Sequence, residues 1–460
     1  MDDFVSWKNM ALLTDLYQLT MCAAYFEEGR DERASFELFI RDMPPHRSYL
    51  IAAGLESVLD YLEHARFPRE AIEYLQTKGF FSESFLDFLA GFRFTGALHA
   101  IPEGALVFPN EPLLRVNAPI IEAQLVETFL LNTVNFQTMV ASKAARIVHA
   151  AKGKQVVDFS LRRTHGTDAG MKVARASYLA GCAGTSNVLA GMKYRIPIYG
   201  TMAHSYVMFH EREQDAFDAY AHVFPQSTTL LIDTYDTVEG ARRAVPVAKA
   251  LELQGKRLQG VRLDSGDLAA LSRAVRAVLD QNRLEYVRIM ASGNLDEYKI
   301  EQLLAQGAPI DIFGVGTAMG TSQDAPVVNV NYKLVEVEGQ AGEYRPVMKL
   351  SAAKITLPGP KQVHRVLKQG EYAYDVIALR TEDLEMAEME TATTLLEQYM
   401  SKGRVLQRES LETIRTRVAE NLARLPARYK TLAPANYPVR ISPQLAALSQ
   451  QLTTAYTRGA

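Results

Sequence analysis

The segment Tyr286–Thr317, YVRIMASGNLDEYKIEQLLAQGAPIDIFGVGT, decides the fold of this chain. It holds two short apolar runs, at 286–293 and 311–316, on either side of an amphipathic stretch at 296–307. Apolar and β-branched residues on both faces are typical of strands buried in a parallel sheet. The order strand, helix, strand therefore predicts a βαβ unit.

The same alternation of apolar strands and amphipathic helices extends toward the N-terminus as far as about residue 155. Further strands are predicted at QVVDFS, RIPIYG, TLLIDTY and QGVRLD (155–160, 195–200, 229–235 and 259–264), and helices at 237–255 and 268–282. Strands that alternate with helices in this way predict the α/β class, either as a barrel of the (β/α)₈ type or as a doubly wound sheet.

Outside this region the pattern is mixed. We predict a half-buried strand at 34–44, a small sheet at 96–119, and helices at 12–29, 50–65, 68–79 and 120–149. In the first helix, Thr14 is the expected N-cap and Gly29 the expected end. The tail from about Asp383 is predicted to be helical and charged.

Composition excludes several classes of protein. The 50 Lys and Arg residues against 53 Asp and Glu residues give a net charge of -3, so no general basic surface is available for nucleic acid. No stretch is long and apolar enough to span a membrane, and the N-terminus lacks the apolar core of a signal peptide. The two cysteines, Cys22 and Cys182, fit no metal or disulfide pattern. These features predict a cytoplasmic protein of enzyme size.

Polar residues gather where the predicted strands end, which is where parallel α/β folds bind ligands. The bends read DFSLRRTHG, GTMAHS, DTYD, RLDSGD, SGNLD and GVGTAMGTS. Helix caps and tight turns explain some of these residues. The guanidinium groups of Arg162, Arg163 and Arg262, however, are suited to bind carboxylate or phosphate with two parallel hydrogen bonds. None of the bends holds a lysine, which disfavours a Schiff-base lyase.

Two bends indicate phosphate binding, because SGN (292–294) and GVGT (314–317) place small residues where backbone N–H groups can face an anion. Asp264 and Asp267 could pair with Arg262 or hold Mg²⁺, which favours one or two carboxylates plus substrate phosphates. His204 stands among small residues in GTMAHS. It is either a packed or capping residue, or an imidazole that moves protons or accepts a phosphoryl group.

Six motifs together resemble the nicotinate phosphoribosyltransferase family. They are TDLYQLTM, DFSLRR, ARASYLAGCAGTSNVLAG, GTMAHSYVM, GVRLDSGDL and FGVGT, in order between about residues 11 and 365. In the tail, only YPVRIS is familiar. The resemblance implies an irregular α/β barrel at 121–365, an N-terminal α/β domain at 1–120, and a mostly helical C-terminal segment at 366–460 that packs back on the N-terminal domain.

The resemblance also implies a reaction. The family transfers 5-phosphoribosyl from 5-phosphoribosyl 1-diphosphate to nicotinate, giving nicotinate mononucleotide and diphosphate for NAD biosynthesis. Mg²⁺ is the expected cofactor, and ATP is a co-substrate whose hydrolysis proceeds through a phosphohistidine. His204 matches the phosphorylated histidine. The alternatives are a sister enzyme for nicotinamide or quinolinate, a sugar-phosphate lyase, and a non-catalytic nucleotide-binding scaffold.

The matched motifs also imply roles for individual residues of this chain. Phe159 would stack on the pyridine ring, and the other nicotinate contacts would be Tyr17, Thr201 and Arg262. Arg162 and the catalytic Asp264 would face the ring and ribose, and the 5-phosphate would be held by Gly293, Asn294, Gly316 and Thr317. Tyr17 would come from a second subunit, which implies a homodimer.

One position bears on specificity, and another departs from the family pattern. The sister enzyme for nicotinamide has an aspartate where this chain has Ser186, so a neutral side chain here favours the acid over the amide; Ser186 could also cap the following helix. After LRR the family usually reads Ala-Gln-Gly, whereas this chain has Thr164-His165-Gly166. No role is therefore assigned to His165.

Overall fold

The computed structural model describes residues 5–458 except 7, 340, 352–354 and 386–389. The chain forms two compact units, one built from residues 1–139 with 327–460, the other from 140–326. The first division falls inside helix α6 (Glu127–Ala150). These limits differ from the predicted divisions after residues 120 and 365.

The second unit is built on a six-stranded parallel sheet in the order β7-β6-β11-β10-β9-β8. Its strands are β6 (Gln155–Asp158), β7 (Gly184–Thr185), β8 (Thr229–Leu231), β9 (Gly260–Leu263), β10 (Arg288–Ala291) and β11 (Ile312–Val315). Apart from the exposed first residues of β6 and β10, nearly every position is buried, which is why these strands are apolar on both faces. The α/β class, the parallel sheet and the presence of a second unit are confirmed.

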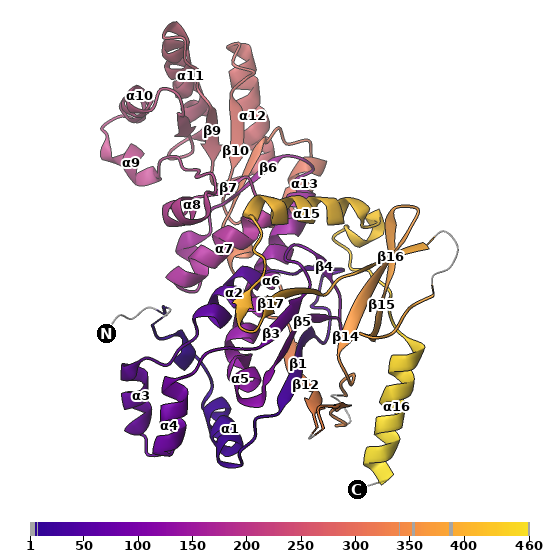
Figure 1. Cartoon of the computed structure of the whole chain (residues 1–460). Helices are drawn as coiled ribbons and strands as arrows, with labels where there is room; N and C mark the ends of the chain where they lie inside the picture. The colour runs from indigo at the N-terminus through magenta and orange to yellow at the C-terminus, as the bar shows by residue number, and fades with distance from the viewer. Residues whose placement is uncertain (1–4, 7, 340, 352–354, 386–389, 459–460) are drawn as a thin grey trace. The chain divides into compact units, whose positions relative to one another are not determined.

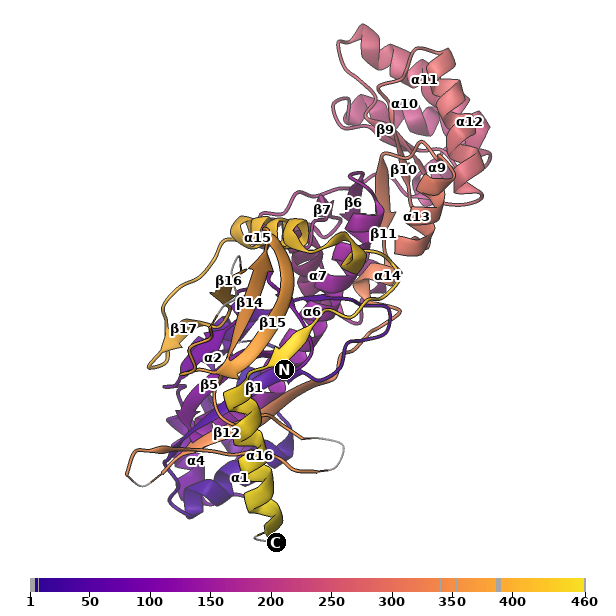
Figure 2. The same ribbon diagram turned by 90° about the vertical axis from the view of Figure 1, so that its right-hand side faces the viewer.

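Helices follow the strands of this sheet. They are α7 (Thr167–Leu179), α8 (Val188–Tyr194), α9 (His204–Phe209), α10 (Glu213–Val223), α11 (Thr237–Leu253), α12 (Leu268–Gln281), α13 (Glu297–Ala305) and α14 (Thr317–Gly320), with the 3₁₀ turn η2 (Leu161–Arg163) after β6. Helices α11 and α12 pack side by side next to β9 and β10 (Figure 2). Val157, Met290 and Ile312 form a core cluster within the sheet, and Phe159 and Tyr199 pack against it.

One predicted strand of this unit is wrong. RIPIYG forms only an isolated bridge between Thr185 and Ile198. Pro197 contributes its carbonyl, which accepts a hydrogen bond from the Thr185 N–H, but proline has no N–H with which to continue a ladder. His204 consequently lies in the first turn of α9 and not at the end of a strand.

The first unit holds a seven-stranded antiparallel sheet in the order β13-β12-β1-β5-β3-β17-β18. Its strands are β1 (Arg33–Ile40), β3 (Ala97–Ala100), β5 (Pro112–Pro119), β12 (Val330–Glu338), β13 (Tyr344–Pro346), β17 (Glu397–Ser401) and β18 (Arg404–Val405). The half-buried pattern predicted for β1 is wrong, because Glu37 is fully buried, 2.7 Å from the Lys361 ammonium.

A second, four-stranded sheet in this unit has the order β16-β14-β15-β19 (Figure 1). Its strands are β14 (Lys361–Lys368), β15 (Glu371–Leu379), β16 (Glu390–Thr394) and β19 (Val439–Ile441); a separate pair consists of β2 (Leu50–Ile51) and β4 (Leu106–Val107). The C-terminal segment is thus richer in strands than predicted. Of the tail predicted to be helical, residues 386–389 lie outside the described residues.

Short helices complete the first unit. They are η1 (Met10–Leu12), α1 (Leu16–Glu27), α2 (Leu55–His64), α3 (Arg69–Gln76), α4 (Glu83–Ala90), α5 (Ile120–Leu125), α15 (Leu411–Arg424), η3 (Ala427–Tyr429) and α16 (Pro443–Arg458). The N-cap of α1 is Asp15 and not Thr14, whereas Gly29 closes the helix with a φ of 67°. No helix in the described part of the chain has the length and apolarity that a bilayer crossing requires.

Candidate active site

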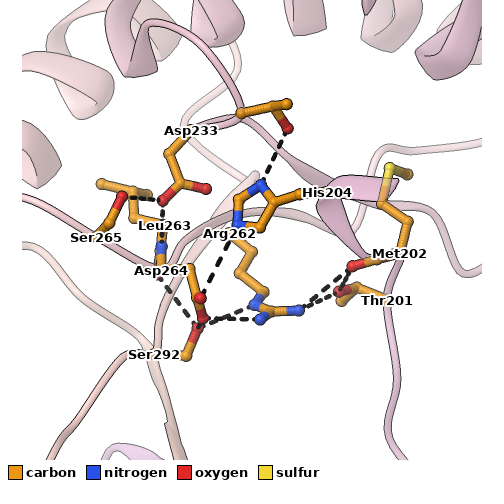
Figure 3. Close-up of polar contacts among 10 residues, drawn as sticks. Thr201, Met202, His204, Asp233, Arg262, Leu263, Asp264, Ser265 and Ser292 are labelled. Carbon is orange, nitrogen blue, oxygen red and sulfur yellow. Dashed lines mark hydrogen bonds and ion pairs between the residues drawn. The ribbon is translucent and has the colours of Figure 1, made fainter. Parts of the chain in front are cut away.

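Arg262 is the centre of a polar cluster at the carboxyl end of the parallel sheet (Figure 3). Its Nε donates to Ser292 Oγ at 2.9 Å, its Nη1 to Thr201 Oγ1 at 2.9 Å, and its Nη2 to Asp264 Oδ1 at 2.7 Å. A weaker contact joins Nη1 to the Met202 carbonyl at 3.4 Å. Since a guanidinium carries five N–H donors, one donor on Nη2 is left for a ligand.

Asp264 lies one residue beyond β9 and is fixed from three sides. Ser292 Oγ and Arg262 donate to its Oδ1, and its own N–H donates to Asp233 Oδ2 at 2.8 Å. Burial raises the pKa of Asp264, but the hydrogen bonds from Ser292 and Arg262, with the charges of Arg262 and His204, outweigh burial and hold the pKa below its ordinary value. Asp264 is therefore a carboxylate at neutral pH.

His204 lies between this carboxylate and the end of β8. Its Nδ1 contacts Thr234 Oγ1 at 3.2 Å, and its Nε2 is 3.9 Å from Asp264 Oδ2. The imidazole is 40% exposed, so a ligand can reach it. When Nδ1 donates to Thr234, Nε2 carries the lone pair that a nucleophile needs.

Asp233 is a site residue that sequence reasoning did not single out. It is only 8% exposed, and its Oδ2 accepts from the Asp264 N–H and from Ser265 Oγ, each at 2.8 Å. Its Oδ1 is buried and has no hydrogen-bond partner in the described structure. The only sequence signal was the motif DTYD at the end of a predicted strand, which does not say which aspartate faces the site.

Phe159 provides an aromatic face beside Arg262, whose Cζ lies 5.6 Å from the centre of the ring. Gly314 makes room for this ring, because a Cβ there would come within 2.6 Å of Phe159 Cδ2. A cavity of about 290 Å³ opens next to the ring. Its lining includes Phe159, Tyr199 and Thr201, but also the first residues of β8, β9, β10 and β11, so the cavity extends toward the amino ends of these strands. Arg262, Asp264 and His204 are not among its lining residues.

Ser186 follows β7, beside Phe159 at the end of the neighbouring strand β6. Its N–H donates to the Asp158 carbonyl at 2.8 Å. The side chain that caps α8 is Asn187, which accepts from the Ala190 N–H, so capping does not account for Ser186. The residue as a whole is partly exposed.

The two bends predicted for phosphate lie at the ends of β10 and β11. Gly293 has a φ of 96°, and a Cβ there would come within 2.0 Å of the Asp264 carbonyl oxygen, so only glycine fits against Asp264. Asn294 also has a positive φ, of 50°. Gly316 lies against the Phe159 backbone and is followed by Thr317, which begins α14.

Four further residues named in the sequence analysis are not part of this cluster. Arg162 is exposed in η2, and no contact joins it to the cluster among the described residues. Tyr17 belongs to the first unit, on α1, and is 49% exposed. Asp267, considered for Mg²⁺, uses its Oδ1 to accept from the Ala269 and Ala270 N–H groups and caps α12. His165 is exposed in the loop before α7.

Comparison with known proteins covers nearly the whole chain. Three family signatures match in order: the nicotinate phosphoribosyltransferase N-terminal domain at residues 12–135, the nicotinate phosphoribosyltransferase family at 154–375, and the corresponding C-terminal domain at 385–449. Nicotinate phosphoribosyltransferase pncB2 of Mycobacterium tuberculosis is 47% identical over 95% of this chain and 92% of that protein.

A second relative and a solved structure are similar to this chain over nearly its whole length. Nicotinate phosphoribosyltransferase of Bacillus subtilis is 40% identical over 94% of this chain and 93% of that protein. The crystal structure of human nicotinic acid phosphoribosyltransferase is 30% identical, superposes with a TM-score of 0.84, and covers 95% of this chain and 99% of that one.

Proposed function

The chain belongs to the nicotinate phosphoribosyltransferase family, and on that premise we propose that it transfers 5-phosphoribosyl from 5-phosphoribosyl 1-diphosphate to nicotinate, with ATP hydrolysis coupled through His204. The observation that carries the proposal is the arrangement of Arg262. One guanidinium is hydrogen-bonded to Thr201, Ser292 and Asp264 and lies beside the Phe159 ring.

The acceptor is a flat ring with a carboxylate. We propose that the ring stacks on Phe159 and that the carboxylate meets Thr201 and the remaining donor of Arg262. Ser186 is neutral, so it adds no like charge against an acid, which supports nicotinate over nicotinamide as the acceptor. Quinolinate carries a second carboxylate, for which these residues supply no second cation.

The donor sugar loses diphosphate at its C1, and positive charge builds on the ribose as that bond breaks. A fixed carboxylate close to this charge lowers the barrier, because it need not reorient during the reaction. We propose this role for Asp264, whose low pKa keeps it ionised. The pyridine nitrogen then forms the bond to C1, and the 5-phosphate is held by Gly293, Asn294, Gly316 and Thr317.

His204 would accept a phosphoryl group from ATP. In this step the Nε2 lone pair attacks the γ-phosphorus, the bond to the bridging oxygen breaks, and ADP leaves. The contact of Nδ1 with Thr234 is compatible with the required tautomer, because the hydroxyl can accept from a protonated Nδ1, and the exposure of the ring supports access. The phosphoryl group later passes to water, which gives phosphate and frees the imidazole.

Mg²⁺ is the cofactor expected of this family, and the donor set fits it. Asp233 offers a buried Oδ1 without a partner, next to the ionised Asp264. A protein usually contributes one or two carboxylates to a Mg²⁺ site, and substrate phosphates supply further ligands. Asp233 and Asp264 would hold the ion, which would neutralise phosphate charge.

We also propose a cytoplasmic homodimer in which Tyr17 from one copy completes the site of the other. Tyr17 is an aromatic residue on α1 and is exposed. Exposure is required of a residue that contacts the site of another subunit. Cys22 and Cys182, both among the described residues, are not disulfide-bonded, which suits a reducing compartment.

A single-turnover experiment with γ-labelled ATP tests the coupling. The account predicts an acid-labile phosphoprotein in the wild-type enzyme and none in His204→Ala. A lyase or a nucleotide-binding scaffold predicts no label in either protein. Label that persists in His204→Ala would place the phosphoryl group on another residue.

A further inference from the structure

The side chain of Asp158, at the end of β6, is buried and fully hydrogen-bonded. The residue is 1% exposed. Its Oδ1 accepts from the Ser160 N–H at 2.9 Å and from Ser160 Oγ at 2.5 Å, and its Oδ2 accepts from Thr185 Oγ1 at 2.7 Å. One carboxylate thus joins the chain that follows β6 to the chain at β7.

On the β7 side the connection continues into the bend that carries Ser186. Thr185 Oγ1 accepts from the Asn187 N–H at 3.0 Å, and Asn187 in turn caps α8. The Ser186 N–H donates to the Asp158 carbonyl at 2.8 Å. Both the side chain and the backbone of Asp158 therefore fix the position of Ser186.

On the other side the carboxylate fixes the turn that carries Phe159. Ser160 is packed against Gly320, where an added Cβ would come within 2.5 Å of Ser160 Cβ. The carbonyl of Ser160 accepts a hydrogen bond from the Arg163 N–H. Phe159 itself is held by its N–H, which donates to the Val315 carbonyl at 2.9 Å. Asp158 is therefore hydrogen-bonded to the residue that follows Phe159 and to the residue that precedes Ser186.

Such an arrangement is costly if it serves only to hold the sheet together. Burial raises the pKa of Asp158, and the hydrogen bonds from Ser160 and Thr185 offset that rise only in part. The backbone ladder between β6 and β7 already joins the two strands without any buried carboxyl group. The carboxylate adds the joint orientation of two turns, both of which face the proposed acceptor.

We propose that Asp158 is a positioning residue for acceptor recognition: it holds Phe159 and Ser186 at the spacing that admits the nicotinate ring and its carboxylate. The proposal rests on the proposed function, because it assumes that these two residues contact nicotinate. It assigns no contact between Asp158 and substrate.

Asp158→Asn tests this directly. The amide can accept from Ser160, but its NH₂ then faces Thr185 and deprives that hydroxyl of an acceptor. We expect KM for nicotinate to rise by about tenfold or more, because Thr185 loses its acceptor and the bend that carries Ser186 loses its side-chain link to residue 158. We expect KM for 5-phosphoribosyl 1-diphosphate and kcat to change by less than about threefold. A merely structural role would instead lower the active fraction, and hence kcat, with both KM values unchanged.

Asp311→Asn is a control for the loss of an aspartate elsewhere in the sheet. Asp311 is more exposed than Asp158, at 35%, and accepts from the Ile289 N–H at 2.9 Å, but it precedes β11, at the opposite end of the same sheet. A second pair of variants guards against misfolding of Asp158→Asn. Thr185→Val keeps the side-chain shape and removes the hydroxyl, and should raise KM for nicotinate; Thr185→Ser keeps the hydroxyl and should not. Thermal melting verifies that each variant is folded.

The inference is overturned if folded Asp158→Asn and Thr185→Val keep the wild-type KM for nicotinate. It is also overturned if Asp311→Asn raises that KM equally, or if both substrates' KM values rise together. A wild-type enzyme that fails to use nicotinate would contradict the proposed function itself. An active wild type with insensitive variants would contradict only the role of Asp158.

Discussion

Replacement of Arg262 by alanine should damage transfer with or without ATP, because the guanidinium organises the site independently of His204. Four contacts to protein atoms occupy most of its donors and leave one on Nη2 for a ligand. Loss of one charge-assisted hydrogen bond costs about 1.5–3 kcal/mol, so kcat/KM for nicotinate should fall by about 10- to 150-fold.

A second effect should accompany this loss. Arg262 helps to keep the pKa of Asp264 below its ordinary value, whereas burial raises that pKa. Without the guanidinium the burial effect gains weight, so the pKa of Asp264 should rise. Asp264 is then protonated at a higher pH. The acidic limb of the profile of kcat/KM against pH should therefore shift to higher pH.

Arg276→Ala is the matched control. Its side chain is 19% exposed, compared with 15% for Arg262, and it also makes three strong hydrogen bonds, to Asp280, Val287 and Leu284. It lies on α12, away from the carboxyl ends of the strands. Steady-state kinetics at neutral pH measure the loss of kcat/KM, and the same kinetics carried from pH 7 down through about pH 4, where an ordinary aspartate titrates, measure the shift of the acidic limb. A kcat/KM within about threefold of wild type in Arg262→Ala, or an equal loss in Arg276→Ala, would refute the reasoning.

Three further predictions follow from the same geometry. His204→Ala should abolish ATP hydrolysis and keep slow, ATP-independent transfer; steady-state assays that still show stimulation by ATP would exclude His204 as the acceptor. Ser186→Asp should lower kcat/KM for nicotinate far more than Ser186→Asn, since like charges about 4 Å apart repel by about 4 kcal/mol at an effective dielectric near 20; a drop below about threefold would mean that Ser186 does not face the carboxylate. Burial and the Asp375 charge hold the pKa of Glu111 well above 4.5, so the folded state favours the protonated acid and loses stability as the pH rises above 4.5. Glu111→Gln should remove this loss, by about 1.4 kcal/mol for each unit of pKa shift, and parallel melting curves against pH for the two proteins would contradict it.

The parallel sheet could be predicted from the sequence because its strands are short, apolar and separated by amphipathic helices. Strands β6 and β8–β11 were predicted, and all of them lie in one sheet. Strand β7 could not be predicted, since Gly184 and Thr185 carry no apolar signal. The strand predicted at RIPIYG was wrong because Pro197 interrupts the ladder that its apolar residues suggested.

The C-terminal segment was mispredicted for a different reason. In β14 and β15 the buried side chains include Arg365 and Asp375, which form an ion pair 2.6 Å long inside the unit. Strand β16 is polar and largely exposed. Charged residues in such positions conceal the alternation by which strands are recognised, and only the fold reveals their partners.

The candidate site was accessible from the sequence to the extent that strand ends gather ligand-binding residues. Thr201, His204, Arg262 and Asp264 do lie together, whereas their predicted roles remain predictions. Asp233 was missed because its importance depends on one buried oxygen without a partner. The hydrogen bond between Asp158 and Thr185 was also hidden, since Thr185 lies on a strand that was not predicted.

The most direct test of the central claim is a product assay with nicotinate, nicotinamide and quinolinate in parallel, each with 5-phosphoribosyl 1-diphosphate and Mg²⁺, with and without ATP. The account predicts that nicotinate mononucleotide is the main product, that its rate rises with ATP, and that the amide and the diacid are used poorly. A preference for nicotinamide or quinolinate, or no nucleotide from any of the three, would contradict it.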